Sequence, residues 1–432
     1  MLTREMKRSL SLCLVNAPAP GLDDDHLEPP LGLLYLAACA RDAGFEVEVA
    51  DLTGTTGRQV PSGFDVYGWS TFSTSFHLSA ELLDVVRRDQ PSAFHIAGGP
   101  HATALPHQAL SSGFDMVVQG EGERALVEAL QAREVGQTLP EVVVGTPPMP
   151  LDDLPYPAFD LVDVDSYTRQ VAGHRCLSVL TSRGCPFACS FCNSTIMGAG
   201  RPIRFRSPQA VVGELEFLRD QYDLGHFRFQ DDNFAFSPRR VAEMTAALRP
   251  LDITYRCFSR VSVCSPEVAQ ALRASGCAHV SFGVESGSPA ILGRHAMNKG
   301  QSPEQIAWAL TNAHAAGLRT RIFLIVGFPG ETDATIAETL ALLTSVPWDE
   351  FVVYPLIPYP GTPIHDEPER FGITSINHTY SDYYQIGSGR AAGFVMKTDS
   401  FDEAHVRQWR DHVIDGLLAA GREWAGDSAN YR

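Results

Sequence analysis

Strand-like and helix-like segments alternate along nearly the whole chain, and this alternation limits the possible fold more than any other feature. In the first 145 residues, the apolar run Leu10–Asn16 precedes a helical pattern over Pro30–Ala43, and Phe64–Ser70 precedes another over Leu78–Arg88. Such alternation predicts a doubly wound, Rossmann-like parallel sheet with helices on both faces. Ligands of these sheets bind where the strands end. Here those ends are the segments 16–21, 70–76, 98–103 and 120–123.

A proline-rich segment interrupts the alternation. Thr146–Pro157 holds five prolines in twelve residues, which predicts a stiff, extended connector. Six longer strand–helix units follow, and their number favours a partial (β/α)6 barrel over a closed barrel of eight units. We therefore expect an α/β domain at residues 9–145, a connector at 146–172, the partial barrel at 173–366 and a helical C-terminal part at 367–432. The last part should contain an amphipathic helix over Asp402–Trp424.

Charge and hydropathy exclude several classes of protein. The chain has 34 Lys and Arg against 51 Asp and Glu, a formal net charge of −17. An acidic chain repels a phosphate backbone, so we expect no nucleic-acid partner and a weak preference for cationic ligands. Leu31–Ala40, the longest mainly apolar stretch, is far below the ~18 residues of a membrane span. The charged N-terminus lacks the features of a signal peptide, which predicts a cytoplasmic protein without a membrane partner.

Three of the nine cysteines are clustered. Cys185, Cys189 and Cys192 lie within eight residues, on a loop that follows an apolar strand. A structural zinc site needs a fourth ligand, and the nearest candidates, His174 and Cys176, come before that strand. Three thiolates on one loop instead suit a [4Fe–4S] cluster with one iron open to an external ligand. Zinc and three unrelated buried thiols are the alternatives.

The spacing CxxxCxxC, with the aromatic Phe191 directly before the last cysteine, resembles the signature of the radical S-adenosylmethionine superfamily. The resemblance implies that the open iron binds the amino and carboxylate groups of S-adenosylmethionine. Reduction of the cluster by an external donor, such as flavodoxin or ferredoxin, then yields a 5′-deoxyadenosyl radical. It also implies that Phe191 lies against this cofactor.

Other strand ends resemble the same family. A short acidic motif receives the amino group of S-adenosylmethionine, two residues contact its carboxylate and ribose, and a glycine-rich loop packs on the adenine. The matching residues are Asp231, Asp232, Arg260, Glu285, Gly327 and Gly330. A helix cap for the acidic motif, and structural ion pairs for the arginine and the glutamate, are the alternatives.

The N-terminal domain resembles the cobalamin-binding domain found in one branch of this superfamily. The motifs that match lie at residues 29–37, 98–103 and 118–123. The Asp-x-His-x-x-Gly pattern that supplies a histidine to cobalt in other cobalamin proteins is absent. The residues implied at the cobalamin site are Ser70, Thr71, Gly98, Gly99, His101, Gly120 and Glu121. A domain that only scaffolds the barrel is the alternative.

Together these resemblances imply a radical enzyme that abstracts hydrogen from a small polar metabolite. The favoured outcome is cobalamin-dependent C-methylation in secondary-metabolite biosynthesis. The alternative is a cobalamin-independent diol dehydratase acting on a cationic amino sugar in antibiotic biosynthesis, a substrate that suits an acidic chain. A non-catalytic iron–sulfur electron-transfer protein is a second alternative. The sequence assigns no residue to proton or hydrogen transfer.

Overall fold

The computed structural model describes residues 10–22, 24–54, 59–196, 202–293, 297–383 and 394–426, which form two compact units. The first unit contains the chain up to residue 20 together with residues 29–166. The second contains residues 21–28 and the chain from residue 167 onward. The short segment 21–28 therefore packs with the second unit, although it precedes most of the first in sequence.

The first unit is built on a six-stranded parallel sheet with the strand order β2-β1-β3-β4-β5-β6. Its strands are β1 (Ser11–Asn16), β2 (Glu46–Asp51), β3 (Val66–Ser70), β4 (Phe94–Gly98), β5 (Met116–Gln119) and β6 (Val142–Val144). The order reverses between β1 and β3, where Asn16 lies opposite Ser70 at the carboxyl ends. Such a reversal is the usual ligand site of an open α/β sheet.

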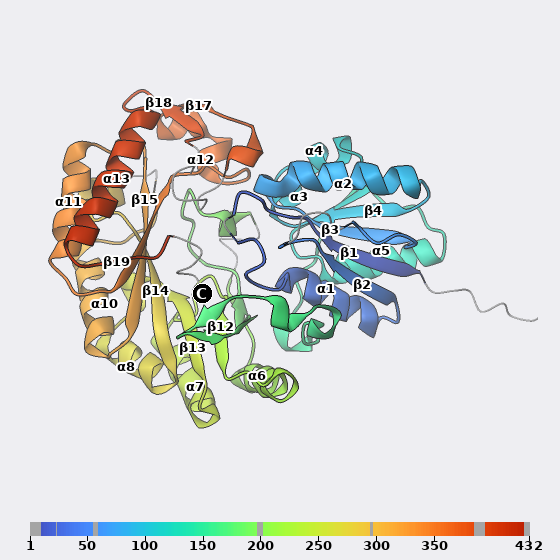
Figure 1. Ribbon diagram of the computed structural model, residues 1–432, viewed down its shortest axis with the longest axis horizontal. Helices are drawn as coiled ribbons and strands as arrows, with labels where there is room; N and C mark the ends of the chain where they lie inside the picture. Colours follow the sequence, from blue (N-terminus) through green and yellow to red (C-terminus); the bar gives the residue numbers. More distant parts are fainter. Residues whose placement is uncertain are drawn as a thin grey trace, which may run out of the picture. The chain divides into compact units, whose positions relative to one another are not determined.

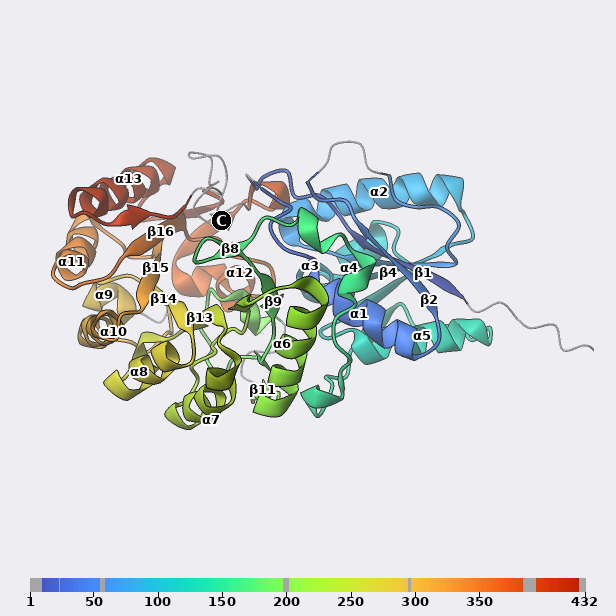
Figure 2. The same ribbon diagram turned by 60° about the horizontal axis from the view of Figure 1, so that its bottom comes forward.

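Helices cover both faces of this sheet, as Figures 1 and 2 show. They are α1 (Leu31–Asp42), α2 (Phe76–Asp89), α3 (Pro100–Ala104), α4 (Pro106–Ser111) and α5 (Glu123–Glu134). Apolar side chains of α2, including Phe76 and Leu83, share a core with Tyr67 and Trp69 of β3. Strands buried on both faces read as continuous apolar runs, and β3 is such a strand.

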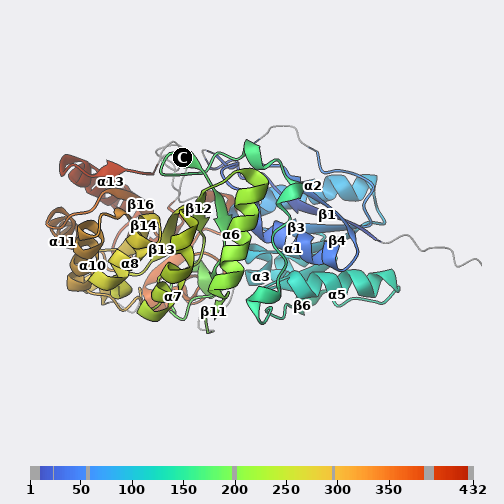
Figure 3. The same cartoon turned by 90° about the horizontal axis from the view of Figure 1, so that it is seen from below.

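The second unit contains a seven-stranded parallel sheet with the order β19-β16-β15-β14-β13-β12-β9. Its first six strands along the chain are β9 (Leu177–Val179), β12 (His226–Phe229), β13 (Thr254–Ser259), β14 (Cys277–Glu285), β15 (Arg319–Val326) and β16 (Glu350–Pro355). The helices α6 (Pro208–Tyr222), α7 (Pro238–Leu248), α8 (Pro266–Ala274), α10 (Pro303–Ala315) and α11 (Asp333–Thr344) lie side by side outside the strands, as Figure 3 shows. The predicted α/β class with an N-terminal Rossmann-like domain and a partial barrel is confirmed.

The predicted C-terminal helix over Asp402–Trp424 is wrong at its end. Helix α13 (Glu403–Ala419) stops before Gly421, which has a φ of +78°. The chain then forms a short strand β19 (Glu423–Trp424), which pairs in parallel with β16. The periodicity of apolar residues could not reveal this strand, because two residues are too few to show a period of two.

The remaining elements are short. They are the paired strands β7 (Gln170–Val171) and β8 (His174–Arg175), β10 (Ser182–Arg183) and β11 (Arg204–Phe205), and β17 (Ile373–Ile376) and β18 (Met396–Thr398), with the helices α9 (Pro289–Leu292) and α12 (Pro363–Asp366). Within the described chain, no helix is both long enough and apolar enough to span a membrane.

The segment 21–28 is held to the second unit through Glu28. Its carboxylate accepts hydrogen bonds from Arg169 at 2.5 Å, from Arg228 at 2.6 and 2.7 Å, and from the Ser178 hydroxyl at 2.5 Å. Burial alone would raise the pKa of Glu28, but the two arginines outweigh it and lower the pKa to about 2. The folded state therefore favours the ionised carboxylate.

We predict that Glu28→Gln lowers the free energy of unfolding by about 3 kcal/mol at pH 7, since it leaves two guanidinium groups in a buried site. The pKa of Glu28 falls from 4.5 to about 2 on folding, so its contribution is complete above pH 4.5 and declines as the pH falls toward 2. Urea unfolding at pH 7 and at pH 3.5 measures this contribution. The difference between wild type and variant should be smaller at the lower pH.

Glu243→Gln is the matched control. Glu243 pairs with Arg239 on the exposed face of α7, so its loss should change the free energy of unfolding by no more than about 0.5 kcal/mol at either pH. A Glu28→Gln deficit that is equal at the two pH values would contradict the proposed ionisation.

Candidate functional site

The cysteine loop begins and ends at the same place in the second unit. Strands β10 and β11, which flank it, pair in antiparallel fashion, with Ser182 opposite Phe205. The next residue, Arg206, donates its backbone N–H to the carbonyl of Thr181 at 2.9 Å and forms a buried ion pair with Glu214. The loop is therefore closed at the carboxyl end of β9, where a parallel barrel carries its functional residues.

The three clustered cysteines lie on this loop, although the described residues contain no group of three His, Cys, Asp or Glu side chains arranged to hold a metal ion. Cys189 is 6% exposed, Cys185 and Cys192 are half-buried, and the N–H of Cys192 donates to the carbonyl of Cys189 at 3.2 Å. Burial raises the pKa of the Cys185 and Cys192 thiols, and the neighbouring thiols and Asp232 add to the effect. Three thiols from one loop fit a cluster that keeps one iron free of protein ligands. Binding of iron would release their protons.

A second segment, between α9 and α10, holds the cysteine loop from the other side. The side-chain amide of Asn298 donates to the carbonyl of Ala188 at 2.7 Å, and the carbonyl of Met297 accepts from the N–H of Ser190 at 3.4 Å. Asn298 has a φ of +47°, a left-handed conformation that asparagine tolerates better than most residues. Sequence reasoning missed this segment, whose Asn-Lys-Gly tract indicates only a turn.

Arg260, directly after β13, contacts the cysteine loop. Its Nη1 lies 3.7 Å from the Cys189 sulfur, and its guanidinium carbon lies 3.7 Å from the centre of the Phe187 ring. Its Nη2 donates to the carbonyl of Lys299. The predicted contact of Arg260 with the S-adenosylmethionine carboxylate stays a prediction, and its position beside a cluster thiol is compatible with it.

Glu285, at the end of β14, forms a buried ion pair. One carboxylate oxygen lies 2.5 Å from Nζ of Lys299, which also donates to the carbonyl of Gly283 at 2.6 Å. Glu285 has a φ of +64°, and the register of β14 against β15 shifts between Gly283 and Glu285. A non-glycine residue in this conformation is strained, and such strain clusters at functional sites. Glu285 therefore forms the ion pair that was the alternative to cofactor binding, and its contact with ribose stays a prediction.

The two acidic residues after β12 have different surroundings. Asp231 is buried and accepts from the Thr181 N–H at 2.7 Å and from the hydroxyls of Thr181 and Ser182 at 2.5 and 2.7 Å. Asp232 is exposed and accepts from the Ser194 hydroxyl at 2.8 Å. Asp231 thus supports the strand that leads into the cysteine loop, and Asp232 is the carboxylate of the pair that can receive an ammonium group.

The glycine-rich loop after β15 touches the cysteine loop through aromatic rings. Phe328 meets the Phe191 ring edge to face, with 5.3 Å between the ring centres. Gly327 and Gly330 have φ values of +94° and +89°, which favour glycine. The buried Glu331 carboxylate accepts from the N–H of Gly327, and burial raises its pKa to about 8. The loop that holds Gly327 and Gly330 therefore lies beside Phe191, and the binding of S-adenosylmethionine by these three residues stays a prediction.

In the first unit, the expected cobalamin residues gather at the carboxyl edge of the sheet. Register places Ser70 beside Gly98, and Thr71 bonds to the carbonyl of Gly98 through its N–H at 2.9 Å and its hydroxyl at 2.7 Å. A Cβ on Gly120 would meet nothing within 4 Å, and one on Gly98 would meet only the Val118 carbonyl, at 3.9 Å. A Cβ at either glycine would therefore meet no close neighbour.

The other expected residues at this edge have scaffold contacts. His101 is fully buried, stacks on Phe76 with 4.0 Å between ring centres, and has Nδ1 3.1 Å from the Ser73 hydroxyl. Burial lowers the pKa of His101 to about 4, so the ring is neutral. A Cβ on Gly99 would lie 2.8 Å from the Thr71 carbonyl oxygen, so this glycine allows the two loops to approach. Glu121, partly exposed, follows Gly120.

Comparison with known families agrees with this division of the chain. Residues 179–343 match the radical SAM superfamily, and residues 25–130 match the B12 binding domain. The resemblances drawn from the cysteine loop and from the N-terminal motifs are therefore confirmed.

Several curated proteins are similar over most of the chain. An uncharacterized methyltransferase of Pyrococcus horikoshii is 32% identical over 359 residues, 77% of each chain. Bacteriochlorophyllide d C-12(1)-methyltransferase of Chlorobaculum tepidum is 27% identical over 80% of this chain and 75% of its own. Cytidylyl-2-hydroxyethylphosphonate methyltransferase of Streptomyces wedmorensis is 26% identical over 72% of each chain.

Among solved structures, the fold is similar to that of the radical S-adenosylmethionine methyltransferase TsrM from Kitasatospora setae. Its complex with tryptophan and a SAM analogue gives a TM-score of 0.72 at 18% identity, over 98% of this chain and 92% of TsrM. A second TsrM structure, with cobalamin and a [4Fe–4S] cluster, gives a TM-score of 0.70 at 19% identity, over 96% of this chain and 89% of TsrM.

We predict that Cys185→Ala, Cys189→Ala and Cys192→Ala each abolish cluster reconstitution and S-adenosylmethionine cleavage, because each thiolate would hold a different iron. Iron content and the yield of 5′-deoxyadenosine under dithionite measure both properties. Cys257→Ala is the control, since its buried thiol lies 3.9 Å from Cys277 in the strands. A Cys189→Ala protein that still binds four irons and forms 5′-deoxyadenosine would refute the cluster assignment.

We also predict that the two acidic residues separate in their effects. Asp232→Asn should weaken S-adenosylmethionine binding about tenfold to hundredfold, because a lost charge-assisted hydrogen bond costs about 1.5–3 kcal/mol. The melting temperature of this variant should be unchanged. Asp231→Asn should lower the melting temperature, because an amide nitrogen cannot accept from the buried hydroxyls. Calorimetric titration and thermal unfolding measure the two effects. Unchanged affinity in Asp232→Asn would leave Asp232 with a structural role only.

Proposed function

Because the chain belongs to the radical S-adenosylmethionine superfamily, in the branch that carries an N-terminal B12-binding domain, we propose that it transfers a methyl group to a carbon atom of a small polar metabolite. The cofactors of this family are a [4Fe–4S] cluster, S-adenosylmethionine and cobalamin. The observation that carries the proposal is the presence in one chain of both cofactor domains, each with its matching residues at the carboxyl ends of parallel strands.

When bound, these cofactors supply a 5′-deoxyadenosyl radical and a methyl group for transfer to carbon. The protein's own part at the cluster is to hold three thiols on a closed loop and to place a guanidinium beside one of them. Arg260 carries that positive charge, 3.7 Å from the Cys189 sulfur. Asp232 offers a carboxylate for an ammonium group. The missing Cβ of Gly327 leaves room for Val406, whose side chain would lie 3.3 Å from a Cβ there.

In this proposal, cobalamin binds at the carboxyl edge of the sheet in the first unit. A Cβ on Gly98 would meet only the Val118 carbonyl, at 3.9 Å, and one on Gly120 would meet nothing within 4 Å, which supports this location. His101 is turned into the core and is neutral, so the proposal does not use it as a cobalt ligand. Backbone groups and small side chains at this edge would then hold cobalamin.

The proposal extends to the substrate, the electron donor and the compartment. The acidic chain favours a cationic metabolite such as an amino sugar of secondary metabolism. A low-potential donor such as flavodoxin or ferredoxin would reduce the cluster. Free thiols suit a reducing compartment, which favours the cytoplasm.

We predict that substrate turnover requires cobalamin. Protein prepared without cobalamin, but with its cluster reconstituted, should form 5′-deoxyadenosine under dithionite and give no methylated product. Added cobalamin should restore methylation. The transfer of label from methyl-labelled S-adenosylmethionine to the product measures it. Full turnover of substrate without cobalamin would overturn this proposal in favour of a radical dehydratase.

Gly98→Trp tests the site of cobalamin. The glycine lies at the open edge and its Cβ position is free of close contacts, whereas Gly99 is unsuitable because any Cβ would strike the Thr71 backbone. The variant should lose cobalamin absorption and methyl transfer but keep 5′-deoxyadenosine formation. Gly225→Trp, at a glycine of the second unit that also lacks close contacts, is the control and should keep all three. Normal cobalamin content in Gly98→Trp would place the cofactor elsewhere.

A further inference from the structure

The strands of the second unit carry a row of charged side chains within the first three residues of each strand. Register places Arg228 beside Arg256, Arg256 beside His279, and His279 beside Arg319. The next pairs are Arg321 with Glu350 and Glu350 with Glu423. Partners in register lie on the same face of a sheet, and such a face in a parallel barrel is normally filled by branched apolar residues. The row lies at the opposite ends of the strands from the cysteine loop.

Most charges of this row are paired. The Glu350 carboxylate lies 2.5 Å from Arg319 and 2.5 Å from Arg321. Arg319 also pairs with Glu423. Arg228 forms an ion pair with Glu28, which also pairs with Arg169. Each carboxylate of the row is therefore engaged by at least one guanidinium group.

Arg256 is the exception. It is 4% exposed, and in the described chain no hydrogen bond or ion pair joins its guanidinium to another residue. Its guanidinium carbon lies 5.9 Å from the centre of the Phe258 ring. Burial and repulsion from Arg321, Arg228 and Arg169 outweigh the attraction of Glu28 and lower the pKa of Arg256 to about 9, so it still carries its charge at pH 7. A buried charge without a hydrogen-bonded counter-charge is costly.

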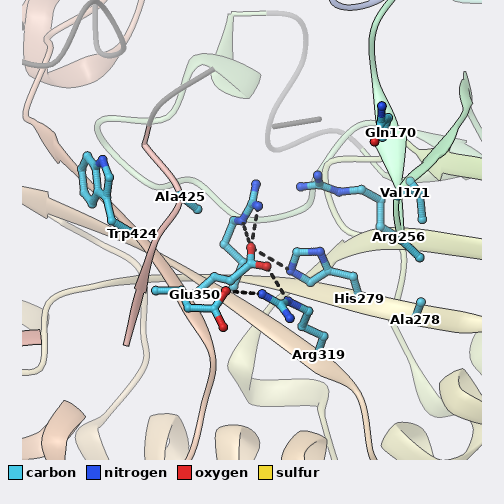
Figure 4. A pocket seen from close by; sticks show the side chains of 13 residues that line it. Gln170, Val171, Arg256, Ala278, His279, Arg319, Glu350, Trp424 and Ala425 are labelled. Atoms are coloured by element: carbon cyan, nitrogen blue, oxygen red, sulfur yellow. Dashed lines mark hydrogen bonds and ion pairs between the residues drawn. The ribbon is translucent and has the colours of Figure 1, made fainter. Parts of the chain in front are cut away.

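A cavity of about 360 Å³ lies beside this guanidinium. Figure 4 shows Arg256, His279, Arg319 and Glu350 around it, with the head of Arg256 directed into the space. The segment 170–173 and the pair Trp424 and Ala425 complete its wall. A volume of this size is within the range of small-molecule sites.

We propose that this cavity binds a small oxyanion, a phosphate or carboxylate group, with Arg256 as its principal ligand. A guanidinium fork matches two oxygens of such a group and gives a charge-assisted bidentate contact. Burial and three arginines lower the pKa of His279 well below its usual value, so its ring is neutral. Its Nε2 lies 3.8 Å from Glu350, beyond hydrogen-bond distance, and is available to a ligand.

The groups around the cavity carry a positive net charge, which favours binding of an anion although the whole chain is acidic. Five guanidinium groups gather here, those of Arg169, Arg228, Arg256, Arg319 and Arg321, against the three carboxylates of Glu28, Glu350 and Glu423. The remainder of the chain is strongly acidic, with a net charge of −17 overall. A positive, partly enclosed site concentrates anions even on an acidic protein.

This site is separate from the radical centre. Arg256 is the third residue of β13, whereas Arg260 follows the end of that strand and contacts the cysteine loop. Loss of an anion from the cavity should therefore leave 5′-deoxyadenosine formation intact, and failure of the proposed function would not affect the binding test.

Equilibrium dialysis with radiolabelled inorganic phosphate tests the proposal, using the full chain at constant ionic strength in chloride. Wild type should bind phosphate at one site, and Arg256→Gln should bind it at least about tenfold more weakly, as expected for a lost charged contact. Competition by acetate and by methyl phosphate identifies which group the cavity prefers. Arg239→Gln, which removes an exposed arginine from α7, should bind phosphate as wild type does.

Thermal unfolding separates binding from a structural role. Without phosphate, Arg256→Gln should have a melting temperature no lower than that of wild type, because the substitution removes an unpaired buried charge. With phosphate, the melting temperature should rise only for wild type and Arg239→Gln. An Arg256→Gln protein that melts lower than wild type in every buffer and still binds phosphate with wild-type affinity would overturn the proposal. So would the absence of one-site phosphate binding by wild type.

Discussion

The cysteine loop depends on hydrogen bonds that come from segments far away in sequence. Asp231 holds Thr181 and Ser182 at its start, and Asn298 holds Ala188 within it. These bonds tie both the start of the loop and Ala188 within it to other strands and loops of the second unit. Folding of the barrel therefore contributes to the ordering of these parts of the loop.

Two of the predicted cofactor residues, Glu285 and Arg260, contact other residues of the protein. Glu285 pairs with Lys299, whose carbonyl accepts from Arg260, and Arg260 reaches the Cys189 sulfur. A chain of contacts thus runs from the end of β14 to a cluster thiol. Removal of one member leaves a buried charge without its partner, so roles in cofactor binding and in positioning cannot be separated by activity alone.

Much of this fold follows from local patterns. The strand–helix alternation predicted both sheets, because apolar runs, helical spacing and glycine stops are read within a few residues. The cysteine spacing predicted the cluster loop for the same reason. Lys299, Glu28 and β19 were missed because each depends on a partner outside its own local segment: Glu285, Arg228 and β16. The tertiary fold determines these pairs, and a single sequence carries no local signal for it.

Strand β13 shows how one short element can serve two kinds of chemistry. Arg256 is the third of the six residues of the strand, and Arg260 directly follows the last one. Arg260 has a sulfur, an aromatic ring and a carbonyl as partners, whereas Arg256 has no hydrogen-bonding partner in the described chain. Both are buried, so the difference lies in what surrounds them. Because a buried guanidinium keeps its charge, the unpaired one requires either a compensating anion or a lasting cost in stability.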